Sequence, residues 1–147
     1  MTYRRRHMKI YAFLLTLAAS LVVSLDTSAL DVSPAIKVMP LVKSTESWNG
    51  TPIAYPQGQA EISGMVIELA PGAETGWHAH PVPSFGMVLE GDLEVTLRDG
   101  QKKRFGQGQG IVEVVATAHN GRNVGTVPVK LVIFYAGAVG TPLTVTP

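Results

Sequence analysis

The sequence predicts an all-β protein of one domain, a sandwich or a barrel. Three observations carry this prediction. After residue 60, short apolar runs follow one another at near-regular spacing, and most of them end at turn residues. Fifteen glycines and ten prolines are spread along the 147 residues rather than gathered in one tract, which suits many strands and turns. No stretch after residue 30 shows the periodicity of an amphipathic helix.

The first thirty residues differ from the rest of the chain. A stretch with four basic residues, 4–9, precedes the uncharged run 10–25, and small residues at 27–29 suit a signal peptidase. We therefore expect residues 1–29 to be a cleaved signal peptide and the mature protein to be periplasmic or secreted. An uncleaved anchor is the alternative, but sixteen uncharged residues fall short of the roughly 20 that span a bilayer. We expect no stable membrane span after cleavage.

The composition of the chain excludes some classes of binding partner and of metal site. Cleavage after residue 29 would remove four of the twelve Lys and Arg residues and one of the eleven acidic residues, leaving eight against ten. The basic run 102–104 is too short for a stripe that follows a phosphate backbone, so we expect no nucleic-acid partner. The chain has no cysteine, which excludes disulfides and thiolate metal sites.

Residues 30–60 are interpreted as an irregular leader, with room for one or two short strands or for an arm exchanged in a dimer. Its four prolines interrupt every periodic run. The barrel is expected over residues 61–140. Its first strand is predicted at 64–69, because this apolar run ends at the turn pair Pro71-Gly72.

The next β pattern runs from Phe85 to Leu97 and is interrupted at 90–92. Leu93, Val95 and Leu97 alternate with polar residues, which predicts one core face and one solvent face. Asp99-Gly100 predicts a hairpin with a type I′ turn, in which both central residues need positive φ. The chain then returns through residues 103–105.

Two further strands are expected near the end of the chain. The apolar run 111–115 follows a glycine-rich link at 106–110, and the run 127–135 is the last long strand pattern.

Three of the four histidines lie in the predicted barrel and suggest a metal centre. His78 and His80 are two residues apart at the start of a strand pattern, so their side chains are expected on one face. His119 comes about forty residues later, where a neighbouring antiparallel strand would bring it alongside the pair. Three imidazoles suit Fe, Mn, Zn, Ni or Cu and leave coordination positions open. The alternative is a surface pair in a turn and a hydrogen-bonded loop histidine.

The spacing of these histidines resembles the two motifs of the cupin family. The first motif is Gly, five residues, His-x-His, three or four residues, Glu, six residues and Gly, and it is matched by Gly72, His78, His80 and Gly91. The second is Gly, five residues, Pro-x-Gly, two residues, His, three residues and Asn, and it is matched by Gly108, His119 and Asn123. The resemblance covers roughly residues 60–137. It implies a single-domain cupin, a double-stranded β-helix or jelly-roll barrel, with one divalent metal ion on His78, His80 and His119.

Three positions depart from the motifs. Ser84 stands where the first motif has its Glu ligand, and Val114 and Ala116 replace the Pro and Gly of the second. Without the carboxylate, the site keeps the full charge of its ion. Glu113 is a candidate replacement ligand, although alternation along the run 111–115 also permits it to face solvent.

The surroundings of the histidines supply the remaining candidate site residues. Trp77, Phe85 and Met87 are candidate walls of a pocket, and Ser84 and Asn123 are candidate polar residues in it, although such residues are more often plain core or turn residues.

The fold alone does not choose among candidate functions. We expect a metal-dependent enzyme acting on a small oxygenated organic molecule; a non-catalytic binding or sensing module and a purely structural metal site are the alternatives. Exposed sheet edges favour a homodimer.

Overall fold

A computed structural model describes residues 35–147; the predicted signal peptide, 1–29, lies outside the described residues. Seven strands form the fold: β1 (Ala60–Leu69), β2 (Ser84–Glu90), β3 (Asp92–Leu97), β4 (Lys102–Gly106), β5 (Gly110–Val112), β6 (His119–Asn123) and β7 (Val129–Ala138). All their pairings are antiparallel. Among residues 35–147, no helix is long and apolar enough to cross a membrane.

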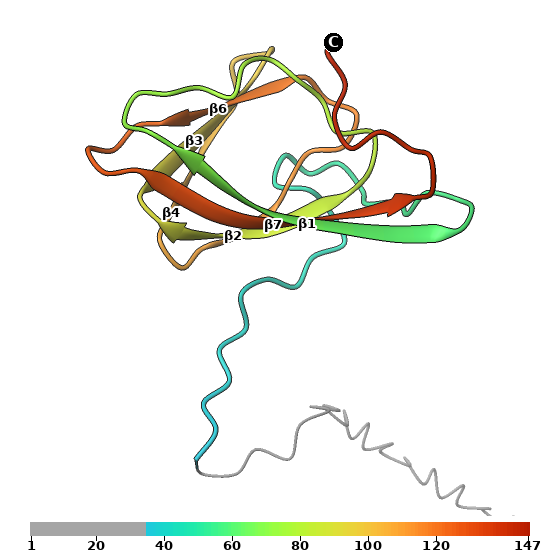
Figure 1. Ribbon diagram of the computed structural model, residues 1–147, viewed down its shortest axis with the longest axis horizontal. Coiled ribbons are helices and arrows are strands. Elements are labelled where there is room, and N and C mark those ends of the chain that lie inside the picture. Colours follow the sequence, from blue (N-terminus) through green and yellow to red (C-terminus); the bar gives the residue numbers. More distant parts are fainter. Residues whose placement is uncertain (1–34) are drawn as a thin grey trace, which may run out of the picture. The chain divides into compact units, whose positions relative to one another are not determined.

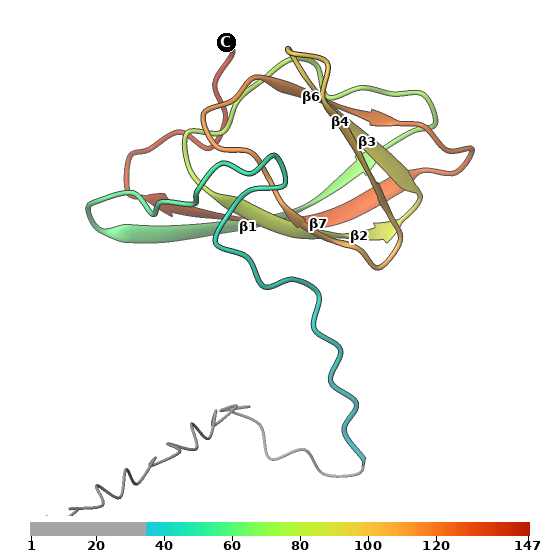
Figure 2. The same cartoon turned by 180° about the vertical axis from the view of Figure 1, so that it is seen from behind.

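The strands form two sheets that enclose the core. One sheet has the order β1-β7-β2-β5 and the other has the order β4-β3-β6, and Figures 1 and 2 show them facing each other. Every second residue of β3 and of β7 is buried between the sheets, as the strand period of two requires. The predicted core face of β3 is confirmed, because Leu93, Val95 and Leu97 are each less than 5% exposed. The all-β barrel is therefore the observed fold.

Strand β6 has no apolar pattern in its sequence and was not predicted by periodicity. Its residues are His-Asn-Gly-Arg-Asn, yet it pairs with β3 from Leu97↔His119 to Leu93↔Asn123. Tertiary pairing here overrides the weak β propensity of Asn and Gly. The pairing matters for the site, because it carries His119 into the barrel.

The hairpin between β3 and β4 forms where it was predicted, but the predicted type I′ turn is wrong. Gly100 has a φ of 90°, whereas Asp99 is not among the residues with positive φ. The N–H of Gly100 donates to the carbonyl of Leu97, and the N–H of Leu97 donates to the carbonyl of Gln101. This is a three-residue loop, in which only the last residue needs the left-handed region.

Residues 45–53 of the leader fold back onto the barrel and form one isolated bridge, Glu46↔Pro52, but no longer strand. A turn at Ser47–Thr51 is closed by two backbone hydrogen bonds, and the N–H of Trp48 donates to the carbonyl of Val112 at 3.0 Å. The Ser47 hydroxyl donates to the carbonyl of Glu113 at 2.8 Å. The leader is thus attached to the end of β5, beside the predicted site.

Candidate metal centre

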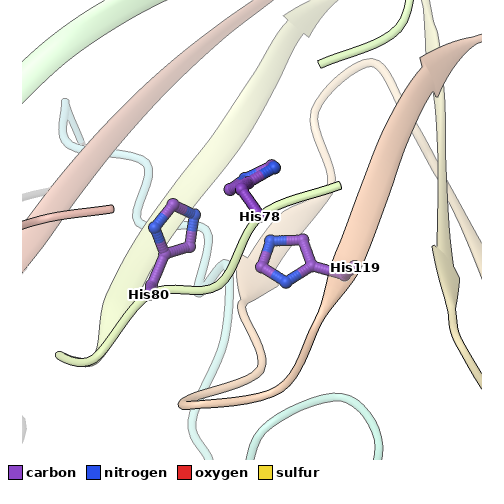
Figure 3. Close-up of side chains that lie close together, drawn as sticks. All are labelled: His78, His80 and His119. Atoms are coloured by element: carbon purple, nitrogen blue, oxygen red, sulfur yellow. The ribbon is translucent and has the colours of Figure 1, made fainter. Parts of the chain in front are cut away.

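The three histidines of the barrel converge on one point. His119 opens β6, and an isolated bridge pairs it with His78, which lies with His80 on the segment before β2. Figure 3 shows the three rings gathered from these two segments. Their ring centroids are 4.3 to 5.0 Å apart, and the nitrogens they offer lie within 4.8 Å of one another. This group of residues is therefore able to hold a metal ion.

Each imidazole has its Nδ1 atom engaged by a backbone carbonyl. Nδ1 of His78 lies 2.8 Å from the oxygen of Gly76, Nδ1 of His119 lies 2.8 Å from that of Thr117, and Nδ1 of His80 lies 2.8 Å from that of Leu143. A carbonyl only accepts hydrogen bonds, so each Nδ1 carries the proton and each Nε2 keeps its lone pair. This is the tautomer and the outer hydrogen bond that metal-binding histidines use. The donor set therefore fits Zn, Fe, Mn, Ni or Cu.

The surroundings keep two of these imidazoles in the neutral form that binds metal. Burial lowers the pKa of His80 to about 4, against the opposing effect of its bond to Leu143. Burial also lowers the pKa of His78, while its bond to Gly76 and the charge of Glu113 act in the opposite direction. Because metal and proton compete for the same nitrogen, a lowered pKa favours metal binding at neutral pH.

The loop before His119 has a left-handed residue at the motif's glycine position. Ala116, at the motif's glycine position, has a φ of 50° and is the one described non-glycine residue with positive φ. Its N–H donates to the carbonyl of His80 at 2.7 Å. The loss of the motif glycine therefore places an alanine in a left-handed conformation that ordinarily favours glycine.

The histidines lie at a small cavity inside the barrel. Its volume is about 60 Å³, enough for a few water-sized groups. Apolar side chains from three strands, β1, β3 and β7, form most of its wall: Ile67, Leu69, Leu93, Val95, Leu131 and Ile133. Besides the histidines, the polar side chains that line it are Thr75, Glu113 and Tyr135. No Lys or Arg is among the described residues that line the cavity.

Glu113 lines this cavity and is only 6% exposed. Its Oε1 accepts hydrogen bonds from the Trp48 indole N–H at 2.8 Å and from the Val114 N–H at 2.9 Å. The solvent-facing alternative for Glu113 is therefore wrong. Its carboxylate is not among the ligand atoms that lie within 4.8 Å of one another, and its role as a metal ligand stays a prediction.

Ser84 lies directly across the ladder from Glu113. The register pairs Phe85 with Val112, and the N–H of Glu113 donates to the carbonyl of Ser84 at 3.0 Å. Ser84 is 1% exposed, and its hydroxyl has no hydrogen-bond partner among the described residues. The position of the motif carboxylate therefore holds a small, buried and unpaired hydroxyl.

The other predicted pocket residues lie outside the cavity wall. Phe85 and Met87 line a separate apolar groove, because they alternate with the inward-facing residues of β2. The ring of Trp77 lies under the Arg98 guanidinium at 3.9 Å. Asn123 is buried, and its amide donates to the carbonyls of Leu69 and Val127. The amide of Asn123 thus has a structural role in joining β6 to neighbouring chain segments.

Sequence reasoning missed several groups that surround the histidines. The Tyr135 ring packs edge-on against His80 at 5.0 Å, and burial, followed by the charge of Glu113, raises the pKa of its phenol. Trp48 and Leu143 come from the leader and from the C-terminal segment. Alternation along β7 would have placed Tyr135 inside, but no sequence signal marks a partner that acts through a backbone carbonyl.

Comparison with known structures shows the same fold in several enzymes. An oxalate oxidase in complex with the substrate analogue glycolate is 24% identical, with a TM-score of 0.50; the match covers 57% of this chain and 45% of that chain. The Lactobacillus farciminis oxalate decarboxylase formate complex is 19% identical, with a TM-score of 0.51, over 60% of this chain and 27% of that one. The DMSP lyase DddQ from Ruegeria pomeroyi is 20% identical, with a TM-score of 0.51, over 66% and 46%.

The chain spans less than half the length of these proteins. No curated protein matches the sequence. Residues 65–135 match the family described as "Cupin domain", and this range contains all three histidines and strands β2 to β6 in full. This match, the antiparallel double-sheet barrel and the histidine geometry agree: the described residues have an all-β cupin fold.

Proposed function

We propose that the protein is an exported, metal-dependent enzyme that acts on a small oxygenated organic molecule. One observation supports this most: three imidazoles, each with Nδ1 held by a backbone carbonyl, offer ligand nitrogens within 4.8 Å of one another beside a cavity. Three protein ligands leave further coordination positions for a substrate. A divalent ion bound there supplies Lewis acidity or, for a redox metal, electron transfer.

The cavity limits the size and character of the substrate. A volume of about 60 Å³ admits a molecule of few non-hydrogen atoms, and the walls are largely apolar. The oxalate oxidase and decarboxylase structures with the same fold carry glycolate and formate by their descriptions. By analogy of size, small hydroxy or carboxylic acids are the first substrates to screen.

The residues of this chain have defined parts in binding. The histidines would hold the ion, the apolar wall would exclude water, and Thr75, Glu113 and Tyr135 would meet the polar groups of the bound molecule. Because the raised pKa keeps the Tyr135 phenol protonated at neutral pH, its hydroxyl is available as a donor.

A non-catalytic binding or sensing role is the second candidate. The observation that favours it is the scarcity of polar groups in the cavity wall, where Glu113 is the one acidic side chain. Turnover of a substrate distinguishes an enzyme from a binding module. Enzyme loaded with Fe(II) or Mn(II) should consume a small hydroxy or carboxylic acid, with or without oxygen uptake, whereas a binding module should retain the molecule unchanged.

Metal content tests the site itself. Replacing His78 or His119 with Ala should weaken metal affinity by more than the roughly 10- to 100-fold that loss of an outer hydrogen bond costs, because a three-ligand site has no spare protein donor. Asn120→Ala is the matched control, since Asn120 follows His119 but bonds outward to Glu74. Equal metal-to-protein ratios in the wild type and in both histidine variants would refute the site.

A further inference from the structure

Glu113 stands across the ladder from Ser84, the position at which the motif has its carboxylate. Directly opposed residues of an antiparallel pair project to the same face, and Glu113 stands opposite Ser84. A serine in place of a glutamate frees volume on this face. The carboxylate of Glu113 lines the cavity beside that position.

The two carboxylate oxygens of Glu113 have different surroundings. Oε1 is fixed by two N–H donors, the Trp48 indole and the Val114 backbone. Neither bond uses Oε2. Two charge-assisted hydrogen bonds on one oxygen hold the group in a single orientation, so the negative charge is presented to the cavity at a fixed point.

Glu113 lines the same cavity as His78 and Tyr135. No Lys or Arg lines the cavity among the described residues, so this carboxylate has no cationic side chain as a partner there. A hydrogen-bond donor on the bound molecule is the natural partner for Oε2.

We propose that Glu113, positioned by Trp48 of the leader, accepts a hydrogen bond from the molecule bound at the three-histidine centre and so selects small ligands that carry a hydroxyl group. This inference rests on the proposed metal site and assigns its specificity. Trp48 is a positioning residue, because it acts through Glu113. In this proposal the carboxylate of Glu113 contacts the bound molecule and does not coordinate the metal ion.

The variant Glu113→Gln tests this role with little change of shape. The amide oxygen must take the Oε1 position, because both Trp48 and Val114 donate there. The amide NH₂ group then replaces Oε2 and turns an acceptor into a donor. A hydroxyl group on the bound molecule then loses its hydrogen-bond acceptor. A molecule that carries only acceptors is no longer repelled by the carboxylate.

The experiment titrates glycolate and acetate into the Co²⁺-loaded protein and follows the visible Co²⁺ absorption. The two probes have the same charge and differ by one hydroxyl. Hydrogen bonds to charged groups are worth about 1.5–3 kcal/mol, so the ratio of glycolate to acetate affinity should fall roughly 10- to 100-fold in Glu113→Gln. Chelation of Co²⁺ by the hydroxyl is common to both proteins and cancels in the comparison.

Further variants locate the effect. Trp48→Phe should lower the same ratio by less, because the Val114 N–H still holds Oε1. Trp77→Phe and Ser84→Ala are the controls, since neither side chain lines the cavity, and both should keep the wild-type ratio. If Glu113→Gln does not fold, Glu113→Asp, which withdraws the carboxylate by one methylene, should also lower the ratio.

Three outcomes would overturn the inference. An unchanged ratio in Glu113→Gln, or in Glu113→Asp where that variant is needed, would remove Glu113 from ligand binding. A marked loss of Co²⁺ affinity in Glu113→Gln would make it a metal ligand instead, and an unchanged ratio in Trp48→Phe would remove the positioning role. Failure of the wild type to bind Co²⁺ appears before any probe is added and overturns the metal site itself.

Discussion

At the scale of single residues, the orientation of each histidine is set by a backbone oxygen. For His78 and His119 that oxygen is two residues earlier in the chain, at Gly76 and Thr117, and for His80 it is far away at Leu143. The histidines themselves were predictable from their spacing. The carbonyls that fix their tautomers were not, because a backbone oxygen leaves no mark on the sequence.

Burial of His80 gives the metal-free protein a pH-dependent stability. The folded pKa is lowered to about 4 from an ordinary value of 6.5, so between these values the unfolded chain binds a proton that the folded chain does not. The free energy of unfolding should therefore fall as the pH drops from about 6.5 to about 4, by up to about 3 kcal/mol. His78 acts in the same direction.

Urea denaturation of the metal-free protein across this pH range measures the effect. The variant His80→Asn removes the titrating group, and the difference between the two stability curves isolates it from the carboxylates that titrate near pH 4. If the free energies of unfolding of the two proteins changed with pH in parallel, the lowered pKa of His80 would be contradicted.

At the scale of elements, the segments outside the barrel strands complete the site. Val145 pairs with Ala79 in an antiparallel bridge, which holds the Leu143 carbonyl against His80. The leader brings Trp48 to Glu113 in the same way. The main strands were predictable from alternation, whereas β6 and these two attachments depend on pairing between distant segments that local pattern does not encode.

Removal of the C-terminal segment should weaken the metal centre. A chain that ends at Pro142 loses the Leu143 carbonyl and the Thr144 hydroxyl, which lie 2.8 and 3.2 Å from Nδ1 of His80. Loss of such an outer partner should lower metal affinity roughly 10- to 100-fold. Isothermal titration with Zn²⁺ measures it.

A chain that ends at Val145 is the matched control, because it keeps both partners of His80 and should bind Zn²⁺ as the full chain does. Leu143 also packs against the core, so thermal unfolding of each chain should be recorded alongside. Equal affinity in a folded chain ending at Pro142 would show that the carbonyl has no part in the site.

At the scale of the whole molecule, the outer face of the β1-β7-β2-β5 sheet is unusually apolar. Ile62 and Val66 on β1 and Phe134 on β7 are 65%, 61% and 48% exposed. Leu41, Val42, Phe85, Met87 and Val132 extend the same face into a groove beside Phe134. A continuous apolar surface of this kind is typical of an interface between protein chains, and it agrees with the expectation of a homodimer.

Val66→Glu should give a monomer in place of the proposed dimer, because the substitution places a charge on the β1 part of this apolar face, where a symmetric interface would bury it twice. Size-exclusion chromatography with light scattering measures the mass. Val127→Glu, at an exposed residue between β6 and β7, should leave the mass unchanged. A wild type that is monomeric at micromolar concentration would contradict the proposed dimer.

The most direct test of the account is X-ray absorption spectroscopy of the Zn²⁺-loaded protein. We predict one ion per chain, with three imidazole nitrogens at about 2.0–2.1 Å and the remaining positions filled by oxygen ligands that exchange with solvent. A spectrum with fewer than three imidazoles, or one that is unchanged when His119 is replaced with Ala, would contradict the three-histidine centre.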